Sequence, residues 1–249
     1  MVISIPHCGI EFPAELKDHY LPDKRDDLDD TDWFLQDLYN YAPNLGITVV
    51  YARYSRWVID LNRDPESKPL YTDGRLITGL TTTTDFLGNA IYQPGFEPDP
   101  KEINRRLEMY FWPYYRHLEM LLEELKSRFG SVLLWDAHSI RHEVKSIRPT
   151  PFPDMILGSN DEKSADKTLI SIALEELKKQ YGVNHNDPFK GGHITRYFGK
   201  PGSGIHALQL ERNKILYMDN SERQFNTERA ERMRECERLM FAKMIEFLR

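Results

Sequence analysis

The 249-residue chain has 33 Lys and Arg residues against 39 Asp and Glu residues, which gives a formal net charge of −6. This acidic balance argues against non-specific nucleic-acid binding, which needs an excess of cations to neutralise phosphates. The 40% hydrophobic and 29% charged fractions are ordinary for a globular protein, and no apolar run approaches the roughly 18 residues that a membrane span needs. We therefore expect neither nucleic acid nor membrane as a partner.

The start of the chain and its cysteine content predict a cytoplasmic location. The first residues, "MVISIP", have neither a basic segment nor an apolar core of signal-peptide length. Two cysteines cannot form a disulfide framework, so a reducing compartment is expected. The length allows one sizeable α/β domain or two small ones. The chain shows no internal repeat, and we expect a single catalytic domain over residues 1–249.

The apolar pattern predicts strands that alternate with helices. The expected strands cover residues 2–5, 47–52, 57–61, 131–137 and 204–211. The expected helices cover residues 29–42, 100–129, 164–181 and 223–248, and Pro113 is expected to kink the second of them. Residues 64–100 are rich in Thr, Gly, Pro and Asp and are expected to form long loops with a hairpin. This alternation predicts a mostly parallel sheet with helices on both faces.

Several polar residues lie where the expected strands end, which is where such sheets bind ligands. These residues are His7, Asn62, Arg63, His138 and Glu211. A single histidine after a strand is more often structural than functional. Two histidines with a carboxylate and an open position, however, are typical of a catalytic zinc site, in which a further glutamate can act as base. The spacing differs from the compact helical HExxH pattern and does not by itself define the ligands.

The first histidine lies in "SIPHCGIE", residues 4–11, which allows other interpretations. Cys8 follows His7 directly, so a thiol nucleophile with a histidine base is one alternative. Glu11 is four residues from His7, but Gly9 and Pro13 prevent a helix that would bring the two together. We expect Glu11 to be a solvated loop or capping residue.

Seven segments resemble one enzyme family. "SIPHCG", "DTDW", "YSRWVIDLNRDP", "LWDAHSI", "PDMILGSND", "FKGGHITRYFGKPGSGIHALQLE" and "LYMD" occur in this order between the first strand and about Asp219. Together they resemble the N-formylglutamate amidohydrolase (N-formylglutamate deformylase) family, and the run from Lys190 to Glu211 is the most specific. The family usually has Ser where this chain has Cys8, a difference that does not involve an expected ligand.

The resemblance implies a fold, a reaction and a set of site residues. The implied fold is a three-layer α/β/α sandwich with a mostly parallel mixed sheet, of the phosphorylase/hydrolase-like (zinc carboxypeptidase-like) type. The implied reaction is the zinc-dependent hydrolysis of N-formyl-L-glutamate to formate and L-glutamate, a step of histidine degradation. Through the more distant resemblance to zinc carboxypeptidases, aspartoacylases and peptidoglycan amidases, the implied ligands of one Zn²⁺ ion are His7, Asp32 and His138. The implied general base is Glu211.

The second ligand has an alternative. Asp30 also lies in the acidic start of the expected helix, but Asp32 is preferred because it begins the apolar register that continues at Leu35 and Leu38. Ligating imidazoles usually donate their other N–H group to an acceptor, so Asp136 and Ser139 are the expected supports of His138.

The implied substrate carries two carboxylates, which arginine side chains bind with two parallel hydrogen bonds. The motif "DLNR" resembles the carboxylate clamp of the carboxypeptidase relatives, so Arg63 with Asn62 is the first prediction for this role. Two glycines precede His193 and suit a backbone that approaches a ligand closely. The other expected substrate-binding residues are Arg56, His193, Arg196 and Tyr197.

Three alternatives remain beside this interpretation. The same zinc site can act on another N-acyl amino acid or a small peptide amide, and the residues that would distinguish these substrates lie in loops. Cys8 can act as a thiol nucleophile, which predicts sensitivity to alkylation and indifference to chelators. The chain can be a non-catalytic metabolite binder, but a binder has no need of a base such as Glu211. A small N-acyl amino acid is the expected partner, and the oligomeric state is left open.

Overall fold

The computed structural model describes residues 1–28, 30–68, 78–145 and 147–249. Within these residues one six-stranded sheet has the strand order β2-β1-β3-β6-β4-β5. The strands are β1 (Val2–Ile5), β2 (Thr48–Tyr51), β3 (Val132–Ile140), β4 (Met155–Gly158), β5 (Val183–His185) and β6 (Ile205–Asn213). Neighbouring strands are parallel except for the antiparallel pair β4 and β6. The predicted mostly parallel mixed sheet is confirmed.

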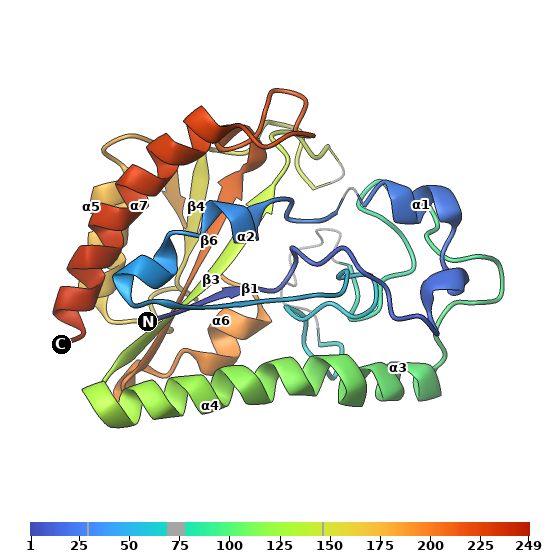
Figure 1. Cartoon of the computed structure of the whole chain (residues 1–249), viewed down its shortest axis with the longest axis horizontal. Helices are drawn as coiled ribbons and strands as arrows, with labels where there is room; N and C mark the ends of the chain where they lie inside the picture. Colours follow the sequence, from blue (N-terminus) through green and yellow to red (C-terminus); the bar gives the residue numbers. More distant parts are fainter. Residues whose placement is uncertain (29, 69–77, 146) are drawn as a thin grey trace.

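Helices cover both faces of this sheet (Figure 1). One face carries α5 (Lys167–Leu177), α7 (Thr227–Phe247) and the short α2 (Leu35–Leu38), and the other carries α4 (Trp112–Phe129) and α6 (His193–Phe198). The predicted three-layer α/β/α sandwich is confirmed. The remaining elements are η1 (Lys17–His19), α1 (Pro22–Asp26), η2 (Ala42–Leu45), α3 (Pro100–Arg106), η3 (Leu107–Phe111), η4 (Pro201–Ser203) and η5 (Lys214–Leu216). Among the described residues, no helix is both long enough and apolar enough to cross a membrane.

The alternation of side chains along β3 separates two apolar clusters. Trp135 packs edge-on against Phe241 of α7, with 5.4 Å between the ring centroids. Leu134 belongs to a different cluster, with Leu118 of α4. Because successive strand residues point to opposite faces, His138 lies on the same face as Leu134. The side chain of His138, near the carboxyl end of β3, therefore points to the face of the sheet that α4 and α6 cover.

A buried ion pair occupies the opposite face of β6. Arg212 and Glu237 of α7 are fully buried, and their side chains are 3.0 Å apart. The hydroxyl groups of Tyr39 and Tyr41 also donate to the Glu237 carboxylate, at 3.2 and 3.1 Å. These contacts pair the two buried charges, which would be costly if either stood alone. Since Arg212 is engaged on this face, the neighbouring Glu211 points to the face that carries His138.

The helix predicted over residues 29–42 is wrong in extent. Position 29 lies outside the described residues, and only Leu35–Leu38 of the rest is α-helical. Phe34 has a φ of 61°, which lies outside the right-handed helical region. The Asp30 carboxylate accepts hydrogen bonds from Trp57 and from the backbone of Phe86, so it ties this segment to other loops. Asp32 therefore lies in a loop and not in the first turn of a helix.

The strand predicted over residues 57–61 is also wrong. The segment is buried, but the sheet does not include it. Side chains satisfy its carbonyl groups in place of a neighbouring strand. The donors are Tyr20 to Trp57 at 2.9 Å, Arg106 to Val58 at 3.0 Å and Tyr115 to Leu61 at 2.8 Å. A short apolar run indicates burial, and burial alone does not distinguish a strand from a packed loop.

The remaining element predictions differ from the structure mainly in length. The strands predicted over 131–137 and 204–211 continue to Ile140 and Asn213, so His138 and Glu211 lie within strands. The helix predicted over 100–129 is interrupted by the π-helical η3 just before Pro113, which cannot donate a backbone hydrogen bond.

Strands β4 and β5 had no counterpart in the prediction. Positions 64–68 and 78–99 form loops, as expected, and positions 69–77 lie outside the described residues.

Candidate metal centre and active site

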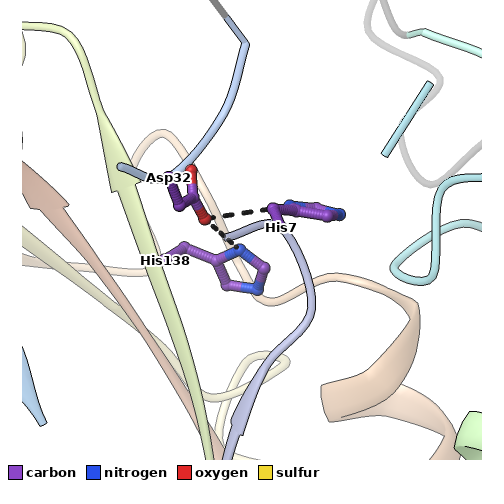
Figure 2. A group of neighbouring side chains, drawn as sticks. All are labelled: His7, Asp32 and His138. Atoms are coloured by element: carbon purple, nitrogen blue, oxygen red, sulfur yellow. Dashed lines mark hydrogen bonds and ion pairs between the residues drawn. The ribbon is translucent and has the colours of Figure 1, made fainter. Parts of the chain in front are cut away.

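Three of the predicted site residues meet at the carboxyl end of the sheet (Figure 2). His7 follows β1, Asp32 precedes α2 and His138 lies in β3. One potential ligand atom from each lies within 4.8 Å of the others. Asp32 Oδ2 is 3.2 Å from His138 Nδ1 and 3.9 Å from His7 Nδ1. The backbone N–H of Asp32 donates to the carbonyl of His7 at 2.9 Å, which ties the two loops together.

The far nitrogen of each imidazole contacts a second carboxylate. His7 Nε2 is 2.7 Å from Asp60 Oδ1, and His138 Nε2 is 3.1 Å from Asp136 Oδ1. His7 Nε2 donates its proton to Asp60, so its Nδ1 turns towards Asp32 without one. His138 Nε2 lies beside the charge of Asp136, and its Nδ1 also faces Asp32. Metal-ligating histidines usually have such a carboxylate behind them. The donor set therefore fits a divalent metal ion.

The charges around the two histidines differ. Burial, assisted by the positive charge of Arg56, lowers the pKa of His7 to about 4. Burial also acts to lower the pKa of His138, but Asp136 and Asp32 outweigh it and hold this pKa well above its usual value. A metal ligand must give up its proton, so a metal ion would take the place of the proton between His138 and Asp32.

Asp60 is a site residue that the sequence predictions missed. Its Oδ2 accepts a hydrogen bond from Arg56 at 2.6 Å, and its Oδ1 accepts one from the backbone of Asn62 at 2.9 Å. Burial acts to raise the pKa of Asp60, but Arg56 and Arg63 outweigh it and keep the pKa well below its usual value. The signal in the sequence was an acid inside the apolar run "WVIDL". A buried carboxylate there needs a partner, and His7 is one.

Glu211 lies beside His138. The two residues are partners in the register of β3 and β6, so their side chains share one face of the sheet. Within the described residues, no hydrogen bond or ion pair engages the Glu211 side chain. Burial raises the pKa of Glu211 to about 7; the charge of His138 opposes this rise, and the charge of Asp32 adds to it. Such a group can exchange protons near neutral pH.

Asn62 supports His138 from behind. Its side chain is buried, with Nδ2 at 2.9 Å from His138 Nε2, and Nδ2 also donates to Asp136 Oδ2 at 3.3 Å. Its Oδ1 accepts from the backbone of Ile194 at 2.8 Å. A Cβ atom at Gly192 would lie 2.3 Å from Asn62 Nδ2. The glycine expected to face a ligand therefore makes room for Asn62, and the contacts of Asn62 point to a positioning role.

Two of the three arginines predicted to bind substrate lie close to the centre. Arg56 is buried against Asp60, and its guanidinium stacks on Phe86 with 5.0 Å to the ring centroid. Arg63 donates to the backbone and hydroxyl oxygens of Thr78 at 2.8 and 2.9 Å, and its Nη1 is 3.9 Å from Asp60 Oδ2. Arg63 is thus held near the metal centre, whereas Arg56 mainly stabilises Asp60.

The other predicted substrate-binding residues lie in α6. Arg196 donates to the carbonyl of Gly191 at 2.9 Å. His193 Nδ1 is 3.9 Å from Asp64 Oδ2, and the ring centroids of His193 and Tyr197 are 5.7 Å apart. Burial lowers the pKa of His193, which favours the neutral imidazole. Their contact with substrate stays a prediction.

Of the two supports predicted for His138, one is confirmed and one is wrong. Asp136 contacts the imidazole as expected. Ser139 instead points to the opposite face of the sheet, where its hydroxyl is 2.9 Å from the hydroxyl of Tyr217. His138 and Ser139 are neighbours within β3, so their side chains point to opposite faces of the sheet. The prediction ended the strand before His138 and so did not apply this alternation to the two residues.

The remaining predictions around "SIPHCGIE" concern Cys8 and Glu11. Burial, with the charge of Asp32 adding to it, raises the pKa of Cys8 to about 12, which disfavours a thiolate nucleophile. Glu11 is exposed and accepts a hydrogen bond from Arg53 at 2.8 Å, as expected of a solvated residue.

Comparison with known proteins identifies a family. A model of the N-formylglutamate amidohydrolase family matches residues 1–218. The chain belongs to this family. An N-formylglutamate deformylase from Pseudomonas putida is 40% identical over 224 residues, which cover 89% of this chain and 83% of the relative. One from Pseudomonas aeruginosa is 40% identical over 221 residues, which cover 88% and 82%.

Two solved structures share this fold. An N-formylglutamate amidohydrolase from Ralstonia eutropha superposes with a TM-score of 0.80 at 28% identity, over 99% of this chain and 93% of that chain. A gene product from Agrobacterium tumefaciens has a TM-score of 0.73 at 18% identity, over 98% and 90%, and shares the fold.

We predict that Asp136→Asn lowers the affinity for zinc by about 10- to 100-fold, because His138 loses the carboxylate behind its Nε2. Titration of the metal-free protein with zinc against a chelating dye measures this affinity. Glu11→Gln is the matched control, since the exposed Glu11 carboxylate contacts Arg53 and no histidine. Equal affinity in the Asp136 variant and the control would show that the carboxylate does not support a metal ligand.

Proposed function

We propose that this chain hydrolyses N-formyl-L-glutamate to formate and L-glutamate with the help of one zinc ion. The observation that supports this most is the buried group of His7, Asp32 and His138 with Glu211 beside it. It lies in a chain that is 40% identical to N-formylglutamate deformylases over most of its length. Family and site geometry thus point to the same chemistry.

The zinc ligands in this proposal are His7 Nδ1, His138 Nδ1 and one oxygen of Asp32. Two histidines and a carboxylate with an open position are the usual ligands of catalytic zinc. When bound, the ion would supply Lewis acidity, which lowers the pKa of water to about 7 and polarises a carbonyl group. Asp30 is the less suitable second ligand, because its two oxygens accept hydrogen bonds from Trp57 and Phe86.

Glu211 acts as the general base in this proposal. Its carboxylate accepts a proton from the attacking water and delivers it to the amide nitrogen, which must leave as an amine. A pKa of about 7 suits both steps, since the group must accept and release the same proton. The absence of any engaged partner for its side chain among the described residues leaves it available for this exchange.

Arg63 binds the α-carboxylate of the substrate in this proposal. The α-carboxylate lies two bonds from the amide nitrogen and therefore close to the reacting carbon. Arg63 meets this requirement because it contacts Asp60, which in turn contacts the ligand His7. His193, Arg196 and Tyr197 are the proposed orienting residues on the α6 side.

We expect the purified protein to release formate from N-formyl-L-glutamate and to contain zinc in a 1:1 ratio. Chelation followed by dialysis should abolish formate release, and one equivalent of zinc should restore it, because the two histidines and Asp32 alone do not activate water. Formate is measured with a coupled dehydrogenase assay and zinc by elemental analysis. Full activity in a metal-free preparation would contradict the proposal.

We expect Glu211→Gln to lower kcat by about 10²- to 10⁴-fold, because the amide cannot accept the proton of the attacking water. Its zinc content should stay at one equivalent, since Glu211 is not a proposed ligand. His138→Ala is the companion variant and should lose the zinc itself. Near-normal turnover in Glu211→Gln would rule out Glu211 as the base.

A further inference from the structure

Two buried amide side chains hold the start of α6. The backbone N–H of Gly192 donates to Gln209 Oε1 at 2.7 Å, and the backbone N–H of Ile194 donates to Asn62 Oδ1 at 2.8 Å. Asn62 Nδ2 also donates to Gln209 Oε1, at 3.5 Å. These bonds fix the backbone on both sides of His193, the first residue of the helix.

Thr195 adds a third tie, from a side chain of the helix itself. It is fully buried, and its hydroxyl donates to Asp136 Oδ2 at 3.3 Å. The other oxygen of Asp136 is 3.1 Å from His138 Nε2. One buried carboxylate therefore contacts both a proposed zinc ligand and α6. The methyl group of Thr195 packs under the preceding loop, since a Cβ atom at Gly191 would lie 2.9 Å from Thr195 Cγ2.

The residues that receive these ties lie directly beside the candidate active site. Asp136 and Gln209 are partners in the register of β3 and β6, as are His138 and Glu211 two residues further on. Residues two apart in a strand share a face, so the two pairs form consecutive rows on the face covered by α6. The helix is thus fastened to the row next to the proposed ligand and base.

We propose that Thr195 and Gln209 are positioning residues that hold α6 at a fixed place relative to His138. A helix of six residues is not stable alone, so its place depends on such contacts. The helix carries three proposed orienting residues, which are His193, Arg196 and Tyr197. The inference rests on the proposed function and adds the groups that set the place of these residues relative to the zinc ligand. Thr195 and Gln209 act through α6 and not on the substrate.

Two substitutions of Thr195 separate the tie from simple packing. Thr195→Val removes the hydroxyl and keeps a methyl group, and Thr195→Ser does the reverse. In Thr195→Val we expect KM for N-formyl-L-glutamate to rise about 3- to 10-fold, because the helix loses a hydrogen bond to a charged group. The value of kcat should change less than about twofold, as for a loss of binding alone. Thr195→Ser should keep the wild-type KM even where its thermal stability falls.

A second substitution and a second measurement check the same claim. Gln209→Met removes the acceptor of the Gly192 N–H group and should raise KM in the same direction. Hydrogen exchange of residues 192–196 in the metal-free protein gives a measurement that does not depend on activity. Exchange should be about 3- to 10-fold faster in Thr195→Val and Gln209→Met than in the wild type, because the ties hold these amides closed. Thr195→Ser should exchange as the wild type does.

Ser164→Ala is the matched control. The buried hydroxyl of Ser164 donates to the carbonyl of Ala207 at 2.8 Å, beside Gly199 at the other end of α6, and does not contact Asp136 or Gln209. This variant should lose stability without a rise in KM.

Four results decide between the outcomes. An unchanged KM or unchanged exchange in Thr195→Val, or an equal rise of KM in Thr195→Ser, would overturn the positioning role and leave the proposed function intact. A joint loss of zinc affinity and kcat in Thr195→Val, with KM unchanged, would also overturn it, since the hydroxyl would then act on the metal ligand. A wild-type protein that releases no formate would overturn the proposed function, and the positioning of substrate-binding residues with it.

Discussion

The contact between each imidazole Nε2 and a buried carboxylate is the interaction on which the rest of the site depends. Asp60 and Asp136 orient the two rings so that both Nδ1 atoms face Asp32. Without these carboxylates, either ring could turn and present its other nitrogen. The carboxylates in turn need their own partners in a buried setting, and Arg56 and Asn62 provide them.

The topology of the sheet explains why residues far apart in the sequence meet. Strands β1, β3 and β6 are adjacent and parallel, so their carboxyl ends lie at one edge. This edge collects His7, His138 and Glu211, and the loop before α2 adds Asp32. Toward the amino ends, the same sheet is packed on both faces by apolar side chains. The fold thus provides a rigid support for a polar centre, as in other α/β enzymes that bind ligands at this edge.

Part of this arrangement was predictable from the sequence. The strand that ends before His7 and the strand that carries His138 follow from short apolar runs, and the family resemblance selected His7, Asp32 and His138 together. The irregular segments were not predictable from periodicity. Residues 57–61 are as apolar as a strand, but Tyr20, Arg106 and Tyr115 satisfy their backbone from distant positions.

Contacts between residues far apart in the sequence also explain the other wrong predictions. The loop at Asp32 depends on the left-handed Phe34 and on contacts of Asp30 with Trp57 and Phe86, which no local pattern encodes. The supporting role of Asp60 depends on a packed loop that has the apolar pattern of a strand, and the change of face at Ser139 depends on where β3 ends. An error of a few residues in a strand boundary reverses such an assignment, because side chains alternate between faces.

The most direct test of the central claim is a crystal structure of the zinc-loaded protein with anomalous data collected on both sides of the zinc absorption edge. We expect one zinc peak bonded to Nδ1 of His7, Nδ1 of His138 and a carboxylate oxygen of Asp32, with Asp60 and Asp136 still on the Nε2 atoms. A zinc peak coordinated by other residues, or bonded to the Nε2 atoms instead, would contradict it.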